Sequence, residues 1–312
     1  MQNPADIVKL RAQAASSIRQ FFAERNVLEV MSPVLTPYGV TDPHLHSIEI
    51  DQAYSQASPS QRVFLRTSPE YVHKRLLSSG VGDLYELGPV FRGHESGRHH
   101  RNEFWMLEWY RLNWSWRQLA DEVIELIRRL SPARDWTVEF RSWLSISEQD
   151  LGIDANSASL CALKSALDER LDAAPQALDH AELLDWWFAS QVQPSFQAET
   201  LTVVYDYPAS QAALARLKPD QPNWAERFEV FAGPLELANG YGELTEPDEQ
   251  QRRFKLDNQR RKTLGLPQMP IDRTLLDAMQ SGLPNCAGVA MGFERLLMAI
   301  FAMHTIDAAC YP

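Results

Sequence analysis

The fold class expected for this sequence is α+β, and the chain contains strand-like pairs of segments as well as helix-like segments. Residues 84–91 and 104–110 are rich in aromatic and branched side chains and enclose a polar stretch, which is the pattern of a hairpin. A second hairpin is predicted within residues 225–245, around a Gly-Pro turn. Residues 6–24 and 118–130 have the apolar periodicity of helices, so helices are expected beside both hairpins.

Composition and charge limit the classes of protein to consider. The 312 residues, 45% of them hydrophobic, can fill the core of one large domain or of two small ones. The net charge of -11 argues against wrapping a long nucleic acid and favours a basic partner. No apolar run approaches the roughly 20 residues that a bilayer requires, and the first residues lack the apolar core of a secretory signal. We therefore expect a cytoplasmic globular protein with no membrane partner.

The three cysteines, Cys161, Cys286 and Cys310, are far apart in the sequence and form no CxxC pair. Neither a disulfide framework nor a thiolate zinc site is indicated by this spacing. We expect reduced thiols with a structural role.

The N-terminal segment is expected to form one helix and one short strand. The predicted helix of residues 6–24 carries Ile7, Leu10, Ala14 and Ile18 on one face. Asn26 interrupts this pattern, and the strand-like residues 27–30 stop before a proline that cannot donate to a sheet. Residues 34–62 are polar and are predicted to form loops.

A predicted strand at residues 63–66 leads into a helix start. The sequence Thr67-Ser68-Pro69-Glu70 combines hydroxyl groups, a proline for the first turn and an acid, and the helix is expected to continue to Gly80. Glu70 also has a simple structural explanation, because a carboxylate is stabilised near the N-terminus of any helix.

The first hairpin has an unusually long polar loop. The loop, residues 93–103, is about twice as long as hairpin loops normally are. We therefore expect it to bind a ligand rather than only to reverse the chain. Cationic side chains gather in or beside it in an otherwise acidic chain: Arg92, His94, Arg98, His99, His100 and Arg101. We therefore expect an anionic ligand there, whereas the alternative is a solvated surface hairpin.

The second strand of this hairpin has two different faces. Strand alternation places Glu108 and Tyr110 on one face with Phe104 and Met106, and the bulky residues Trp105, Leu107 and Trp109 on the other. A carboxylate and a phenol near a cationic loop suit a ligand that has phosphates at one end and an amine at the other.

The middle of the chain carries weaker signals. After the helix at residues 118–130, residues 131–200 are expected to form a mostly helical insertion, including residues 181–191, without a site of its own. Strand character resumes at residues 201–207 and ends at Pro208.

The second hairpin concentrates acids. Asn239, Tyr241 and Glu243 are two residues apart and share a face of its second strand. An acid-lined face is seldom pure packing, because burying unpaired acids is costly, although an edge strand kept soluble by charge is the alternative.

Two further acids of this hairpin, Glu229 and Glu236, are expected to meet across it. Glu236 has the opposite parity to Glu243, so both can address one ligand only if a bulge intervenes. Gly240 is our candidate for that bulge.

The C-terminal part is expected to contain a charged helix at residues 246–264, which mixed charges identify as a surface helix rather than a nucleic-acid site. Residues 288–300 predict a short apolar strand that turns through Gly292 into a helix with Arg295 in its first turn. Arg295 is either a phosphate-binding residue or a plain surface cation.

Four ordered motifs together resemble the catalytic domain of class II aminoacyl-tRNA synthetases, most closely the lysyl branch. They are the TSPE helix start, the FR hairpin with EFWMLEWY, the ELANGYGEL strand and the GxxxGxxR ending. The resemblance covers nearly the whole chain and is most specific at residues 68–111 and 226–295. It implies one catalytic domain over residues 1–312, a mainly antiparallel sheet flanked by helices, and a homodimer.

The chain starts close to the first motif of this family, near Pro33, and ends soon after the third, which leaves no room for an anticodon-binding barrel. In this respect it is similar to truncated lysyl-tRNA synthetase paralogues that modify elongation factor P. That resemblance implies that ATP activates lysine or (R)-β-lysine as an aminoacyl-adenylate, and that the acyl group passes to a lysine side chain of elongation factor P. Recognition of a tRNA anticodon is not expected.

The resemblance also assigns roles to individual residues. The amino-acid pocket would comprise Ser68, Glu70, Glu108, Tyr110, Asn239, Tyr241 and Glu243. ATP would be bound by Arg92, His94, Arg101, Glu236, Leu237, Gly292 and Arg295. Arg92 and Arg295 would act catalytically on the substrate carboxylate and the phosphates, because guanidinium groups match oxyanions. Glu229 and Glu236 would hold magnesium, which prefers oxygen ligands.

The chain departs from the family pattern in the loop. Arg92-Gly93-His94 stands where Arg-Asn-Glu is usual, with Glu95 one place late, and Arg101-Asn102-Glu103 stands where Asn-Pro-Glu is usual. Our hypothesis is that His94 or Glu95 reads the adenine in a shifted loop. Ala290 replaces the glycine typical of lysyl-tRNA synthetases, and its methyl group would reshape the pocket floor toward a β-amino acid.

Two other functions are compatible with these residues. One is a ligase that joins an amino acid to a small amine, and the other is a non-catalytic regulatory or interaction paralogue. Lysine-dependent exchange between ATP and pyrophosphate separates both enzymes from the paralogue, and the acceptor separates the two enzymes.

Overall fold

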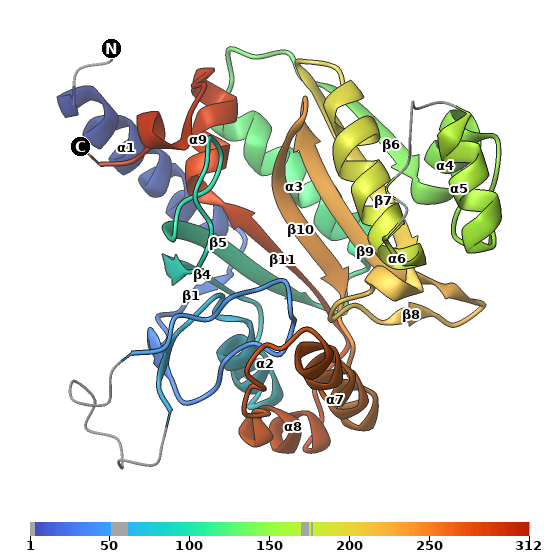
Figure 1. Ribbon diagram of the computed structural model, residues 1–312. Helices are drawn as coiled ribbons and strands as arrows, with labels where there is room; N and C mark the ends of the chain where they lie inside the picture. Colours follow the sequence, from blue (N-terminus) through green and yellow to red (C-terminus); the bar gives the residue numbers. More distant parts are fainter. Residues whose placement is uncertain (1–3, 51–61, 170–174, 176, 312) are drawn as a thin grey trace. The chain divides into compact units, whose positions relative to one another are not determined.

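The computed structural model describes residues 4–50, 62–169, 175 and 177–311, which form two compact units (Figure 1). Unit 1 comprises residues 1–114 and 244–312, and unit 2 comprises residues 115–243. Each unit contains a sheet and helices, which confirms the predicted α+β class.

The sheet of unit 1 has the strand order β1 (Leu28–Glu29), β4 (Leu84–Phe91), β5 (Glu103–Leu112) and β11 (Cys286–Gly292). β1 pairs with β4 in parallel, whereas β4 with β5 and β5 with β11 are antiparallel. A separate antiparallel pair joins β2 (Leu35–Thr36) to β3 (Phe64–Leu65). The first predicted hairpin is therefore confirmed, and its long loop spans residues 92–102.

The helices of unit 1 are α1 (Pro4–Ala23), α2 (Glu70–Ser78), α7 (Pro247–Thr263), α8 (Arg273–Gln280) and α9 (Phe293–Phe301), followed by the short 3-10 helix η5 (Ile306–Ala309). α1 buries Ile7, Ala14 and Ile18 of the predicted apolar face, whereas Leu10 is half-buried. Asn26 follows α1 in a left-handed conformation with φ of 55°. Phe22 stacks on Tyr85 of β4 at 4.3 Å and meets Trp109 of β5 edge to face at 5.5 Å. The Trp109 face of the hairpin is thus the core face, as predicted.

The register of the three central strands places key side chains together. Glu86 of β4 and Ala290 of β11 both lie directly opposite Glu108 of β5. Residues paired in this way point to the same face of a sheet. Two acids and the unusual alanine therefore share the face opposite to Trp109.

Unit 2 has a sheet with the order β10 (Leu235–Gly242), β9 (Gln221–Ala232), β7 (Thr200–Pro208) and β6 (Thr137–Ser142), and β8 (Leu217–Lys218) pairs with β9. Only β6 and β7 are parallel. Its helices are α3 (Trp116–Leu130), α4 (Trp143–Leu151), α5 (Leu160–Asp168), α6 (His180–Trp187), the π-helix η2 (Phe188–Val192) and the 3-10 helices η3 (Gln193–Ser195) and η4 (Ala209–Gln211). The second predicted hairpin is β9 with β10, and Gly233 adopts the left-handed conformation in its turn.

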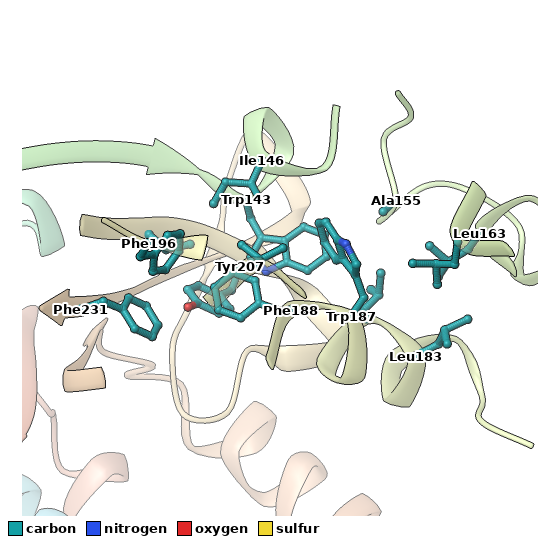
Figure 2. Close-up of a cluster of buried hydrophobic side chains, with 14 residues drawn as sticks. Trp143, Ile146, Ala155, Leu163, Leu183, Trp187, Phe188, Phe196, Tyr207 and Phe231 are labelled. Atoms are coloured by element: carbon teal, nitrogen blue, oxygen red, sulfur yellow. The ribbon is translucent and has the colours of Figure 1, made fainter. Parts of the chain in front are cut away.

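An aromatic cluster forms the core of unit 2 where its helices pack on the sheet (Figure 2). Trp143 of α4 and Trp187 of α6 meet edge to face at 5.2 Å, and Phe188 contacts Tyr207 of β7 and Phe231 of β9. The region of residues 131–200 contains the helices α4, α5 and α6, and it also contributes strand β6, which the sequence did not predict. Its helices bury the aromatic side chains against β7 and β9.

In the described part of the chain, no helix is both long enough and apolar enough to span a bilayer. Residues 51–61 of the predicted loop of residues 34–62 lie outside that part.

Candidate active site

The start of α2 meets strand β5 at the predicted amino-acid pocket. The Ser68 hydroxyl donates to Glu108 Oε2 at 2.7 Å and accepts the backbone N–H of Glu70 at 3.0 Å. The Tyr110 hydroxyl donates to the other oxygen of Glu108 at 2.9 Å. Two predicted pocket residues, Ser68 and Tyr110, therefore hold the buried carboxylate of a third, Glu108, and Ser68 also accepts from the backbone of Glu70.

Glu70 lies in the first turn of α2 and pairs with Lys74 at 2.7 Å, one turn along the helix. Burial raises the pKa of Glu70, Lys74 opposes this effect, and the charge of Glu108 adds to the increase. The Glu70 and Glu108 carboxylates thus repel each other in a buried region. A bound ammonium group would relieve this repulsion.

Sequence reasoning missed three residues next to this pocket, namely Arg66, His73 and Glu86. Glu86 accepts hydrogen bonds from Arg66 Nη1 and from the Ser32 hydroxyl, each at 2.7 Å. His73 of α2 is fully buried, with Nε2 3.0 Å from Glu86 Oε2 and Nδ1 3.5 Å from Glu108 Oε1. The signal that could have found Glu86 is the hairpin pairing, which places it opposite Glu108.

The electrostatics of this cluster are strongly perturbed. Burial disfavours the charged form of Glu86, but hydrogen bonds from His73 and Ser32 together with Arg66 outweigh it and lower the pKa of Glu86 from 4.5 to about 2. Burial by itself lowers the pKa of His73, but the carboxylates of Glu108 and Glu86 outweigh this effect and raise the pKa above 6.5. Each shift favours the charged form of its group.

These shifts predict how stability depends on pH. Glu86 contributes stability that is present above its unfolded pKa of 4.5 and is lost as the pH falls toward its folded pKa of about 2. The difference between these pKa values corresponds to on the order of 3 kcal/mol. His73 contributes stability below pH 6.5 that is lost as the pH rises through its raised pKa.

We therefore expect the free energy of unfolding of the wild type to exceed that of Glu86→Gln most clearly between pH 4.5 and pH 6.5. The difference should shrink as the pH falls below 4.5. Urea unfolding at a series of pH values measures it. A difference that does not change with pH would contradict the assignment.

Arg92 follows β4 and lies beside the start of α2. Its Nε donates to the backbone carbonyl of Thr67 at 3.3 Å, the residue before Ser68, and its guanidinium group lies 5.2 Å from the centre of the Phe104 ring. Glu95 approaches Arg92 at 3.8 Å. The cation is thus anchored close to the pocket while part of it remains exposed to solvent.

Arg295 lies in the first turn of α9, after Gly292, as the sequence predicts. It contacts the far end of the hairpin loop: its Nε donates to the His99 carbonyl at 3.2 Å, and Nη2 lies 2.7 Å from His100 Nε2. Burial lowers the pKa of His99, and the charges of Arg98 and Arg295 add to this effect. Arg92 and Arg295 therefore flank the same loop.

The other two predicted ATP-binding residues of this loop lie elsewhere along it. Arg101 pairs with Asp307 of η5 at 3.6 Å. His94 is exposed, adopts a left-handed conformation with φ of 61° and packs edge to face on His46 at 4.7 Å. Whether His94 or Glu95 reads an adenine stays a prediction.

In unit 2 one of the predicted acids, Glu229, belongs to a hydrogen-bonded network of side chains on β7, β9 and β10. Tyr207 donates to Glu229 at 2.7 Å, and Arg227 pairs with the other carboxylate oxygen of Glu229. Arg227 also donates to the Asn239 side chain at 3.3 Å, and Asn239 in turn donates to the Tyr241 hydroxyl at 3.0 Å. Sequence reasoning missed Arg227, which joins the predicted residues into one network.

The predicted bulge exists, but its position was wrong. The register shifts between Glu236 and Ala238, so the extra residue is Leu237, whereas Gly240 pairs regularly with Phe228. Glu236 lies opposite Phe231, which has the same parity as Glu229. The bulge thereby brings Glu236 to the face that carries Glu229, because an extra residue reverses the alternation of the strand.

Glu229 and Glu236 are close enough to influence each other. Burial raises the pKa of Glu229, Arg227 opposes this, and the charge of Glu236 raises it further. Such a pair favours binding of a cation. Within the residues that the structure describes, no cluster of three or more His, Cys, Asp and Glu side chains could hold a metal ion. Glu243 is buried at the end of β10, where its backbone bridges to Ala215.

Comparisons with known proteins identify the family of the chain. A family model described as tRNA synthetases class II (D, K and N) matches residues 2–312. A protein of Mannheimia succiniciproducens named elongation factor P--(R)-beta-lysine ligase is 40% identical, and the alignment covers 97% of this chain and 94% of the relative. Proteins of the same name from Vibrio vulnificus and Salmonella paratyphi B are 42% and 43% identical, with 99% and 95% of this chain covered and 96% and 91% of the relatives. The chain therefore belongs to the family of class II tRNA synthetases (D, K and N).

Proposed function

We propose that this protein is an ATP-dependent ligase that activates (R)-β-lysine or lysine and attaches it to a lysine side chain of elongation factor P. The observation that carries the proposal is the identity of about 40% with ligases of that name over nearly the whole chain. The buried carboxylate of Glu108 supports the proposal further, because a buried anion suits the ammonium group of a diamino acid.

In the first reaction, a carboxylate oxygen of the amino acid attacks the α-phosphorus of ATP, and pyrophosphate leaves. The attacking carboxylate is already a nucleophile, so alignment and charge neutralisation are sufficient and no general base is needed. Arg92 would hold the substrate carboxylate and α-phosphate, and Arg295 would hold the terminal phosphate. Both cations flank the same loop, which is consistent with one extended anionic ligand.

In the second reaction, the neutral amine of the acceptor lysine attacks the carbonyl carbon of the adenylate. An amide bond forms, the bond to the phosphate oxygen breaks, AMP leaves and the amine gives up a proton. The protein contributes mainly by holding the adenylate and excluding water.

Substrate choice is proposed to depend on the face of β5 that carries Glu108. Glu70, Glu108 and Tyr110 supply charge and hydrogen bonds for an ammonium group, with Ser68 at the rim. Ala290 lies directly opposite Glu108 on β11, so its methyl group projects to the same face and favours the displaced amine of a β-amino acid. In unit 2, Asn239, Tyr241 and Glu243 are proposed to contribute to amino-acid recognition.

Magnesium is proposed as a partner of ATP. The neighbouring carboxylates Glu229 and Glu236 fit this ion, because it is bound by one or two carboxylates together with substrate phosphates. Bound magnesium would neutralise phosphate charge. A homodimer, expected for the family, and a cytoplasmic location belong to the same proposal.

We expect Glu236→Gln to raise several-fold the magnesium concentration needed for half-maximal pyrophosphate exchange, since one anionic oxygen ligand is lost. Titration of magnesium at saturating ATP measures this change. Glu139→Gln, an exposed acid on β6, serves as the matched control. An unchanged magnesium requirement would contradict the site.

The function itself is tested with elongation factor P as acceptor. We expect that incubation with ATP and (R)-β-lysine or lysine increases the intact mass of the factor by one lysyl residue, and that replacing its acceptor lysine by arginine abolishes the gain. Exchange between ATP and pyrophosphate without a gain in the mass of elongation factor P would favour a ligase for a small amine. Absence of exchange with both isomers would favour a non-catalytic paralogue.

A further inference from the structure

The two acids that face each other across β4 and β5 create an electrostatic problem. Glu86 and Glu108 are directly paired in the register, and they are only 4% and 2% exposed. Like charges opposite each other on neighbouring strands are destabilising, and burial strengthens the repulsion. The fold needs a positive charge between them or a proton on one of them.

The side chain of His73 lies between these acids. Each of its ring nitrogens faces a carboxylate oxygen, Nε2 toward Glu86 at 3.0 Å and Nδ1 toward Glu108 at 3.5 Å. Ionised carboxylates only accept hydrogen bonds, and a neutral imidazole donates from one nitrogen alone. Nε2 is at hydrogen-bond distance from Glu86, whereas Nδ1 lies at ion-pair distance from Glu108 without a hydrogen bond. Only the imidazolium form presents a positively charged N–H to both acids.

The other charged groups around His73 lead to the same conclusion. On α2, the helix that carries His73, Lys74 pairs with Glu70. Arg66, which precedes this helix, pairs with Glu86 of β4. Tyr110 packs its ring edge to face on His73 at 5.6 Å and donates its hydroxyl to Glu108. The three acids Glu70, Glu86 and Glu108 are therefore balanced by Lys74, Arg66 and the imidazolium, whereas a neutral His73 would leave one buried acid without a cation.

We propose that His73 is a positioning residue of the amine pocket, which remains protonated at neutral pH, lies between Glu86 and Glu108, and keeps the Glu108 carboxylate oriented for the substrate ammonium group. The inference rests on the proposed function, which makes Glu108 the acceptor of that ammonium group. The raised pKa of His73 agrees with the geometry.

Nuclear magnetic resonance of protein labelled with nitrogen-15 in histidine tests the protonation state without any substrate. We expect the His73 ring to carry protons on both nitrogens between about pH 6 and pH 8, unlike an ordinary histidine. Its signals are assigned by their absence from His73→Gln. In the nearly isosteric Glu86→Gln variant we expect the same ring to lose a proton within that range. A neutral His73 in the wild type at pH 7 would overturn the proposal.

Pyrophosphate exchange tests the positioning role. In Glu86→Gln we expect the KM for the diamino acid to rise by about tenfold as the pH is raised through the range in which His73 now titrates, and the KM for ATP to stay unchanged. His304→Gln, an exposed histidine, is the matched control and should keep the wild-type pH profile. Equal effects on both KM values would indicate a general structural role instead.

A double variant provides a further check. If His73 and Glu86 act on Glu108 as one unit, His73→Gln with Glu86→Gln should lose no more than the worse single variant, whereas independent roles would give additive losses. A wild type that exchanges pyrophosphate with neither lysine isomer would refute the proposed function, and the resonance measurement would still decide the state of His73.

Discussion

The Glu108→Gln variant is expected to lose about 100-fold in kcat/KM for the diamino acid in pyrophosphate exchange, because a buried, hydrogen-bonded partner of the ammonium group loses its charge. Glu108 is 2% exposed and is contacted by Ser68, Tyr110 and His73. Because this position is closely surrounded, another acid cannot move in to take the place of its carboxylate. The amide keeps the shape of the side chain. The loss is therefore expected in the binding of the amino acid, and the KM for ATP should change little.

The control is Glu139→Gln, the same change at an exposed position of β6. Thermal unfolding of both variants separates a loss of stability from a loss of recognition. If Glu108→Gln retained wild-type kcat/KM for both lysine isomers, the pocket around Glu108 would not be the amine site.

The Arg92→Ala variant is expected to lower kcat for pyrophosphate exchange by about 100-fold to 1000-fold, because a cation aimed at developing phosphate charge contributes mainly in the transition state. Arg92→Lys should recover only part of the loss, since an ammonium group cannot form the two parallel hydrogen bonds of a guanidinium group. Stability should change little, because Arg92 makes one hydrogen bond to the backbone and a distant ion pair.

Arg98→Ala is the matched control on the same loop. Arg98 is exposed, and its Nε donates to the His304 carbonyl rather than to the start of α2. We expect kcat of this variant to stay close to that of the wild type. Equal losses in both variants would mean that the loop needs positive charge in general and that Arg92 has no special position.

Local patterns predicted most elements of the fold correctly. Both hairpins, the helix that starts at Glu70 and the turn from Gly292 into α9 follow from β-propensity, glycine and proline positions, and helix start signals. These signals depend on neighbours within a few residues. The family resemblance added the choice of site residues within these elements.

Three features of the site could not be read from local patterns. The bulge was assigned to Gly240 because glycine is typical of bulges, but the register places it at Leu237. His73 resembles any helical residue until α2 packs on the hairpin. Glu86 gains its meaning only from its pairing with Glu108.

The sequence by itself determined the order of the elements, the cationic loop and the acids of the two hairpins, because hydrophobic periodicity and turn chemistry are local properties of the chain. Only the tertiary structure decided which charges meet. Arg66, His73 and Glu86 lie on different elements, and their pairing depends on strand register and helix packing. Burial then increases the interaction energy of each of these ion pairs, since charges interact far more strongly away from water than at the surface.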